Sequence, residues 1–277
     1  MSAVKPARPT DKALIDFAHL LADAAERATM PNFRKVISVQ DKGSAEDFDP
    51  VTVADRNAER AMTKLIAKTF PDHGIIGEEF GSRNETAPLR WVLDPVDGTR
   101  AFITNCFLFG TLIALERDDG SGYRPVLGVI AHPVPGVALI GHGDECTLHA
   151  ADGSTRSTRV RSCDRLDQAT VLATTHWSTG EQHNHEFTER IVRRARLYRT
   201  WGDCFGYFAL ATAGADLMLD PTLAHWDVAA IVPVIESAGG VVTSWSGGDP
   251  LAELSLIASA GALHDEVLQL LHPGQGA

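Results

Sequence analysis

Apolar positions recur along this chain at two spacings, which predicts a mixture of helices and short strands. Residues 10–30 carry apolar side chains at helical spacing, and a second helix is predicted over about residues 54–69. Short apolar runs at 75–76 and 91–93 are predicted to form buried strands. Each of these two runs leads towards acidic residues.

The rest of the chain is predicted to alternate strands and helices, with polar loops at 40–49 and 156–165. Strands are predicted at 110–115, 126–131, 137–141, 146–149, 171–174, 217–219, near 241 and at 255–258. Helices are predicted at 183–194, 203–213, 225–237 and 263–271. Alternation of this kind indicates an α/β or α+β fold with helices packed on sheet faces. We expect one domain over 1–277, with approximate halves 1–150 and 151–277.

Charge and composition narrow the classes of function. The chain has 25 Lys and Arg against 36 Asp and Glu, a formal net charge of −11. This balance argues against nucleic-acid binding, which needs a basic surface. A soluble acidic surface explains most of the charge, but an acidic protein can still bind an anionic substrate when metal cations lie between the two.

Cysteine usage and hydropathy indicate a cytoplasmic protein. The four cysteines are dispersed without a CxxC pair, so neither a zinc site nor a disulfide framework is indicated. The N-terminal residues lack the apolar core of a signal peptide. No segment approaches the roughly 18 apolar residues of a membrane span. We therefore expect no membrane contact.

Three acidic clusters each lie where an apolar run ends: Glu78-Glu79, Asp94 with Asp97, and Asp227. A short strand that ends in a carboxylate places the charge at the rim of a sheet, where open α/β structures bind ligands. The three clusters are therefore candidates for one site.

Residues 94–97 have the pattern of a metal-binding turn. Pro95 fixes its own φ, and the turn can aim Asp94, the carbonyl of Val96 and Asp97 in different directions. Magnesium prefers several oxygen ligands at about 2.0–2.1 Å, completed by water or substrate phosphate. The stretch therefore predicts a magnesium site.

Gly98 and Thr99 extend this turn towards a phosphate group. Gly98 lets a phosphate approach the backbone, and Thr99 can open a helix whose N–H groups bind anions. Taken alone, Asp-Pro and Asp-Gly are also common turn formers, and the stretch could be only a capped helix start. The presence of the other two acidic clusters favours a metal and phosphate site over a capped helix start.

Gly77-Glu78-Glu79, residues 94–99 and His225-Trp226-Asp227 resemble the three signatures of the inositol monophosphatase superfamily. Their order and approximate spacing match, and the similarity covers nearly the whole chain. The resemblance implies a five-layer αβαβα sandwich of the inositol monophosphatase and fructose-1,6-bisphosphatase type. It also implies dependence on Mg²⁺, with two or three ions per site, sensitivity to lithium, and a homodimer.

The resemblance also implies roles for individual residues. First-metal ligands would be Glu78, Asp94, the Val96 carbonyl and Asp97, and second-metal ligands Asp94, Asp97 and Asp227. Thr52 and Asp55 match a segment that supports the site through Thr99. Two cations can clamp the oxygens of an in-line displacement, while Glu78 and Thr99 orient the attacking water and accept its proton. Lys42 either matches a lysine on a mobile family loop or is a solvated loop residue.

Two segments point to a particular phosphate ester. Residues 98–103 (GTRAFI) and 201–207 (WGDCFGY) resemble segments of the family's histidinol-phosphate phosphatases. Trp201 stands where that group has a glycine, and His225-Trp226 where Pro-Tyr or Pro-Trp is frequent. L-Histidinol phosphate carries an ammonium and an imidazole, with which Asp203 and Asp220 can pair.

Arg199 can make a bidentate contact to phosphate or to a carboxylate, or it is a surface arginine. The predicted substrate-binding set is Gly98, Thr99, Arg100, Arg199, Asp203, Asp220 and Asp227.

Three functions remain open at this point. Hydrolysis of L-histidinol phosphate in histidine biosynthesis is favoured. The alternatives are an inositol-1-phosphate, sugar-phosphate or bisphosphate-nucleotide phosphatase, and a catalytically silent binding protein on the same fold. The silent protein is disfavoured because every expected ligand position retains an oxygen donor. His176, His183 and His185 lack HExxH spacing, which argues against a histidine metal site. No phosphate-cradling loop follows Cys204, which argues against a thiol nucleophile.

Overall fold

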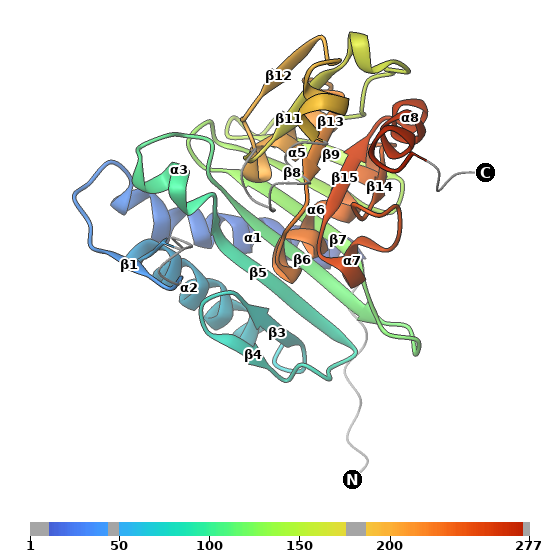
Figure 1. The fold of residues 1–277 in the computed structure, drawn as a ribbon. Helices are drawn as coiled ribbons and strands as arrows, with labels where there is room; N and C mark the ends of the chain where they lie inside the picture. The colour runs from blue at the N-terminus through green and yellow to red at the C-terminus, as the bar shows by residue number, and fades with distance from the viewer. Residues whose placement is uncertain (1–10, 44–49, 176–186, 274–277) are drawn as a thin grey trace.

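The protein is described here by a computed structural model that covers residues 11–43, 50–175 and 187–273. Its elements stack in five layers, in the order helix, sheet, helix, sheet, helix (Figure 1). The predicted layered sandwich is therefore confirmed. The division into halves near residue 150 stays a prediction.

The larger sheet has eight strands in the order β10-β9-β8-β7-β6-β5-β3-β4. Their bounds are β3 (Gly74–Gly77), β4 (Gly81–Arg83), β5 (Leu89–Asp97), β6 (Gly110–Asp118), β7 (Tyr123–His132), β8 (Val137–His142), β9 (Glu145–Ala150) and β10 (Thr155–Ser157). Neighbouring strands are antiparallel except β3 and β5, which are parallel. Because β3 and β5 run in the same direction, their carboxyl ends deliver residues to the same edge of the sheet.

Helices α1 (Asp11–Thr29) and α2 (Val53–Thr69) cover one face of this sheet, as the apolar spacing predicts. Phe17 and Leu21 of α1 and Met62 of α2 are buried in one cluster with Trp91 and Ile113 of the sheet. The ring centroids of Phe17 and Trp91 lie 5.4 Å apart. This packing fixes α2, and with it the residues at its N-terminus.

Helices α5 (Asp203–Ala211) and α6 (His225–Ser237) lie between the two sheets. The core they form joins Leu112 and Ile130 of the large sheet to Met218 of the small one. Gly128 allows α6 to approach the large sheet closely, because an added Cβ there would lie 2.1 Å from the carbonyl oxygen of Ala230. The N-terminal residues of both helices lie near the end of β5, since Cys204 contacts Asp97 and Asp227 lies close to Asp94 and Asp97.

The smaller sheet has five strands in the order β12-β11-β13-β15-β14. Their bounds are β11 (Thr170–Ala173), β12 (Leu197–Arg199), β13 (Leu217–Asp220), β14 (Val241–Thr243) and β15 (Leu256–Ser259). Helix α8 (Gly261–Leu271) packs its Leu263 and Val267 on the outer face, against Val171 and Ile257. Short elements complete the described chain: η1 (Met30–Asn32), β1 (Val39–Asp41), β2 (Pro50–Thr52), α3 (Thr99–Ile103), η2 (Leu166–Gln168), η3 (Thr188–Val192) and α7 (Pro250–Glu253).

Local predictions differ from the structure at several places. The predicted polar loop at 156–165 begins within β10, which pairs with β9. The predicted polar loop at 40–49 contains the end of β1, which pairs antiparallel with β2; residues 44–49 lie outside the described residues. The helix predicted at 183–194 is confirmed over residues 187–192, where Thr188–Val192 form the π-helix η3, and it ends in a turn at 193–194; residues 183–186 lie outside the described residues. Strand β12 was not predicted, because three residues are too few to show an alternating pattern.

Within the described residues, no helix has both the length and the apolar character that crossing a bilayer requires.

Replacing Gly128 with alanine should lower the free energy of unfolding by about 2–3 kcal/mol, because added volume must push α6 away from the sheet. Urea denaturation measures this change. Gly261→Ala is the control, since a Cβ at the start of α8 meets its nearest atom, Val241 Cγ2, at 3.8 Å. Equal losses in both variants would contradict the close packing of α6 on the sheet.

Candidate active site

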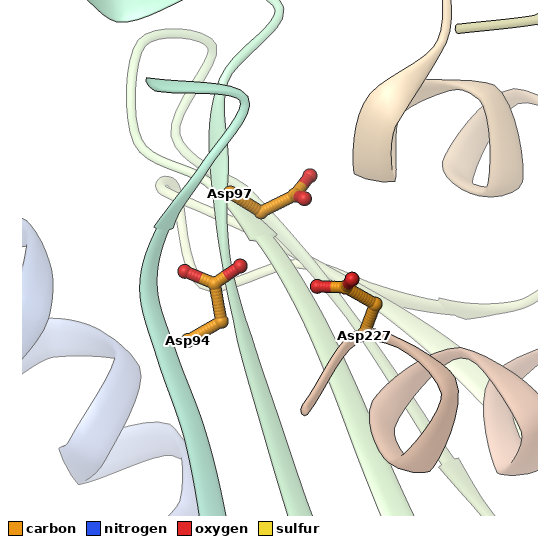
Figure 2. Close-up of side chains that lie close together, drawn as sticks. All are labelled: Asp94, Asp97 and Asp227. Atoms are coloured by element: carbon orange, nitrogen blue, oxygen red, sulfur yellow. The ribbon is translucent and has the colours of Figure 1, made fainter. Parts of the chain in front are cut away.

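Three carboxylates converge at the end of β5. Asp94 and Asp97 come from β5 and Asp227 from the first turn of α6, and their side chains face a common space (Figure 2). One oxygen from each of the three lies within 4.8 Å of the others. Asp94 is buried, and Asp97 and Asp227 are partly buried. The structure therefore brings together three predicted metal ligands from distant parts of the chain.

Each of these carboxylates uses one oxygen to accept a backbone N–H. Oδ1 of Asp94 accepts from Val96 (3.0 Å), and Oδ2 of Asp227 accepts from Ala224 (2.8 Å). Oδ2 of Asp97 accepts from Cys204 at the start of α5. A carboxylate has about four acceptor positions, so these bonds orient the groups and still leave acceptors for an ion.

The strand itself is irregular where it carries the two aspartates. Pairing of β5 with β6 shifts register between Asp94 and Asp97. Pro95 has no N–H to give to a ladder, and its carbonyl instead accepts a hydrogen bond from Thr111 Oγ1 (2.9 Å). The predicted turn is thus a bulge within a longer strand, and it allows both aspartates to reach the same space.

Burial and mutual repulsion make the charged forms of these groups unfavourable. Burial raises the pKa of Asp94 well above its ordinary value, and the charges of Glu78, Asp97 and Asp227 raise it further. Burial likewise raises the pKa of Asp227, and it raises the pKa of Asp97 to about 6. Crowded oxygen donors of this kind fit a hard divalent cation, which prefers carboxylates and relieves their repulsion.

Glu78 and Glu79 follow β3 at the same edge of the sheet, and Lys42 binds both. The Lys42 ammonium lies 3.0 Å from Oε1 of Glu78 and 2.8 Å from Oε1 of Glu79. The Glu79 side chain is 2% exposed and that of Glu78 17%. Although burial opposes it, the pKa of Lys42 is raised by its hydrogen bond to Glu79 and the charge of Glu78. Lys42 is therefore exposed and also ion-paired with both glutamates.

Thr52, Asp55 and Thr99 form a connected group beneath β5. Thr52 caps α2, and its Oγ1 donates to Oδ2 of Asp55 at 2.6 Å. Oγ1 of Thr99 lies 3.0 Å from the Val96 carbonyl oxygen and 3.4 Å from Oδ1 of Asp55. Burial raises the pKa of Asp55. The arrangement links α2 to Thr99, as the resemblance implies.

Asp203 lies directly over Gly98. Gly98 has a φ of +78°, and a Cβ there would lie 3.0 Å from Oδ2 of Asp203. Asp203 itself has a positive φ of 48°, and its N–H donates to Thr174 Oγ1 at 2.9 Å. Burial, and then the charge of Asp97, raise the pKa of Asp203 to about 7. Asp203 thus borders the carboxylate cluster, and the charge of Arg100 on α3 opposes the rise in its pKa.

The remaining predicted substrate residues lie in different surroundings. Asp220 is buried at the end of β13, where its Oδ2 accepts from Tyr207 (2.9 Å) and its Oδ1 from the Thr174 N–H (3.3 Å). Burial raises the pKa of Asp220 to about 7. Arg199 is exposed, and its guanidinium lies 5.9 Å from the centre of the Trp201 ring. The structure therefore places Asp203 next to the carboxylate cluster, Asp220 buried at the end of β13, and Arg199 at the surface.

Sequence reasoning missed Glu59, a buried carboxylate of α2 that accepts the N–H groups of Glu79 and Phe80. The available signal was its position on the apolar face of a helix.

Cys204 is buried and burial raises its thiol pKa, in agreement with the exclusion of a thiol nucleophile. His176, His183 and His185 lie outside the described residues.

The layered sandwich is similar to the fold of a solved phosphatase. An inositol monophosphatase from Zymomonas mobilis superimposes with a TM-score of 0.81 at 34% identity, over 95% of this chain and 99% of that one. The profile of the inositol monophosphatase family matches residues 11–275, and the chain belongs to that family. It is a phosphatase-type hydrolase by this membership.

Two curated relatives are similar to this chain over most of its length. A chloroplastic bifunctional phosphatase, IMPL2, from Arabidopsis thaliana is 38% identical over 94% of this chain and 73% of its own length. A histidinol-phosphatase from Streptomyces coelicolor is 33% identical over 92% of this chain and 95% of its own.

Metal-free protein should lose thermal stability as the pH rises from 4 to 7. The folded pKa values of Asp97 (about 6), Asp203 (about 7) and Asp220 (about 7) exceed the ordinary value of about 3.9, so the folded state binds more protons across this range. Their stabilisation is therefore complete below pH 4 and lost towards pH 7. Scanning calorimetry in EDTA should show a lower Tm at pH 8 than at pH 5.5.

Asp203→Asn is the control for this pH dependence, because it removes one of the titrating groups. Its Tm should change less between pH 5.5 and 8 than that of the unmodified protein. A Tm that rises over this interval in both proteins would contradict the raised pKa values.

Proposed function

We propose that this chain is a Mg²⁺-dependent phosphomonoesterase whose substrate is L-histidinol phosphate. The observation that carries the proposal is the convergence of Asp94, Asp97 and Asp227, each with one oxygen held by a backbone N–H. A cytoplasmic location and a homodimer, both expected from the sequence, belong to the same proposal.

Oxygen donors at the end of β5 would hold the ions. Glu78, Asp94, the Val96 carbonyl and Asp97 would hold one ion, and Asp94, Asp97 and Asp227 a second, with two or three ions per site. When bound, such ions supply positive charge for the phosphoryl oxygens and lower the pKa of water. The oxygen-only donor set supports magnesium over a softer metal.

Glu78 and Thr99 would orient the attacking water and take its proton. Thr99 Oγ1 lies within reach of both the Val96 carbonyl and Asp55, so the hydroxyl can donate inwards while its lone pairs face the water. Thr52 gives Asp55 two hydrogen bonds, from its N–H at 2.9 Å and its Oγ1 at 2.6 Å. Asp55 therefore keeps a fixed orientation, and its Oδ1 would accept the Thr99 hydroxyl proton when Thr99 takes one from the water.

The substrate would lie beside Gly98 and the first residue of α5, Asp203. Gly98 and Thr99 would face the phosphate, with Arg100 beside it, and Asp203 would face the ammonium or imidazole. A cation next to Asp203 favours the charged carboxylate, so substrate and side chain would stabilise one another. Asp220 and Arg199 stay in the predicted set. The hydrogen bonds that Asp220 accepts from Tyr207 and Thr174 also support an indirect role, in which it fixes the wall behind Asp203.

Inositol-1-phosphate hydrolysis is the second candidate function. The similarity to the Zymomonas mobilis inositol monophosphatase favours it, whereas the Streptomyces coelicolor relative favours histidinol phosphate. Inositol phosphate has no cationic group, so a substitution of Asp203 should affect hydrolysis of histidinol phosphate and not that of inositol-1-phosphate.

Phosphate release is the direct test of the proposed reaction. The protein should release phosphate from histidinol phosphate with Mg²⁺, and EDTA should abolish release. Asp94→Asn should lower the rate by more than about 100-fold, beyond the 10–100-fold that loss of a ligand's supporting partner costs. Asp167→Asn, an exposed aspartate paired with Arg165, is the control and should retain full activity. Full activity after removal of all metal, or no release from any ester, would contradict the proposal.

Asp203→Asn should lower kcat/KM for histidinol phosphate by about tenfold or more, because a charge-assisted hydrogen bond contributes about 1.5–3 kcal/mol. The kcat/KM for inositol-1-phosphate should scarcely change. The same pair of measurements on Asp220→Asn distinguishes direct contact with the substrate from support of Tyr207, since support affects both esters alike. Equal losses for both esters in Asp203→Asn would contradict histidinol phosphate as the substrate, but not the phosphatase activity.

A further inference from the structure

A second buried carboxylate lies on α2, one turn beyond Asp55. Glu59 falls among the buried positions of the helix, between Ala58 and Met62, and is 1% exposed. A carboxylate on the apolar face of a helix is costly unless its oxygens are satisfied. Its partners therefore indicate what it does.

Both oxygens of Glu59 accept backbone N–H groups from one turn. Oε2 accepts from Glu79 at 2.7 Å, and Oε1 accepts from Phe80 at 3.0 Å. These residues belong to the three-residue connection 78–80 between β3 and β4, whose strands pair up to Gly77 and Gly81. The carboxylate therefore holds the turn that carries Glu78.

Gly77 makes this contact possible. A Cβ at residue 77 would lie 2.0 Å from Oε1 of Glu59. Only a glycine at the end of β3 lets the carboxylate reach the two N–H groups that follow. Helix α2 and the 78–80 turn are therefore in close contact at Gly77 and Glu59.

The side chain of Glu79 is fixed independently of its backbone. Lys42 lies 2.8 Å from Oε1 of Glu79, and Arg56 Nε lies 3.9 Å from its Oε2. With Glu79 held through both its N–H and its carboxylate, the turn leaves Glu78 facing the site, where its charge raises the pKa of Asp94.

We infer that Glu59 is a positioning residue: by holding the 78–80 turn, it fixes the Glu78 carboxylate beside Asp94 and so sets the affinity of the site for divalent cations. The inference rests on the proposed metal-dependent phosphatase. Asp55 and Glu59, four residues apart on α2, then orient two different catalytic segments from one rigid helix.

Glu59→Gln tests this inference with little change in side-chain shape. An amide has one acceptor oxygen, so one of the two turn N–H groups would face an NH₂ group instead. Binding of Mn²⁺, followed by the electron paramagnetic resonance signal of the free ion, should weaken by about tenfold or more. The Mg²⁺ concentration for half-maximal phosphate release should rise by a similar factor. At saturating Mg²⁺, kcat should stay within about twofold, because the bound ion then holds Glu78 in its working position.

Two further variants separate positioning from general destabilisation. Gly77→Ala pushes Glu59 from the opposite side and should weaken Mn²⁺ binding in the same way. Ile66→Val, a buried change two turns further along α2, should lower Tm without changing Mn²⁺ affinity. Unchanged Mn²⁺ affinity in folded Glu59→Gln, or an equal loss in Ile66→Val, would overturn the inference. If the unmodified protein binds Mn²⁺ but releases no phosphate, the proposed function fails and the Mn²⁺ data alone decide the role of Glu59.

Discussion

Negative charge crowds together where β5, β3 and α6 meet, and much of the surrounding structure holds that charge in place. Asp94, Asp97 and Asp227 lie within a few ångströms of one another, and Glu78 adds a fourth carboxylate. Like charges at such distances destabilise a fold unless other contacts compensate. Here, backbone N–H groups fix the orientation of each aspartate, and the apolar layers on either side keep α6 and the sheet from separating.

Helix α2 is one of the elements that hold the acidic site in place. Its apolar face packs on the large sheet, and the same face carries Asp55 and Glu59 towards the site. The helix therefore serves as a rigid support for Thr99 and for the 78–80 turn at once. A functional group placed by a packed helix is held more accurately than one placed by a loop alone.

Much of this arrangement could be predicted from the sequence, because it depends on local signals. Helical spacing predicted α1, α2 and α6, and the acidic residues that follow apolar runs predicted Asp94, Asp97 and Asp227 as one cluster. The strand-end argument was wrong for Asp227, which lies in the first turn of α6. Contacts between distant segments could not be predicted in this way. The N–H of Cys204 on Asp97, the stacking of Asp203 on Gly98, and the hydrogen bonds of Asp220 depend on how α5 docks against β5. Glu59 was missed because a single carboxylate within an amphipathic helix does not change its period.

The hydrogen bond between Cys204 and Asp97 spans 107 positions of the chain. During synthesis, a chain that has emerged only as far as β10 already carries Asp94 and Asp97, but it lacks Cys204 and Asp227. Contacts of such long sequence separation form late, because the loop must close before they contribute. The acidic cluster is therefore completed only when α5 and α6 dock on the large sheet, and an ion that needs all three aspartates binds only to chains that have finished folding.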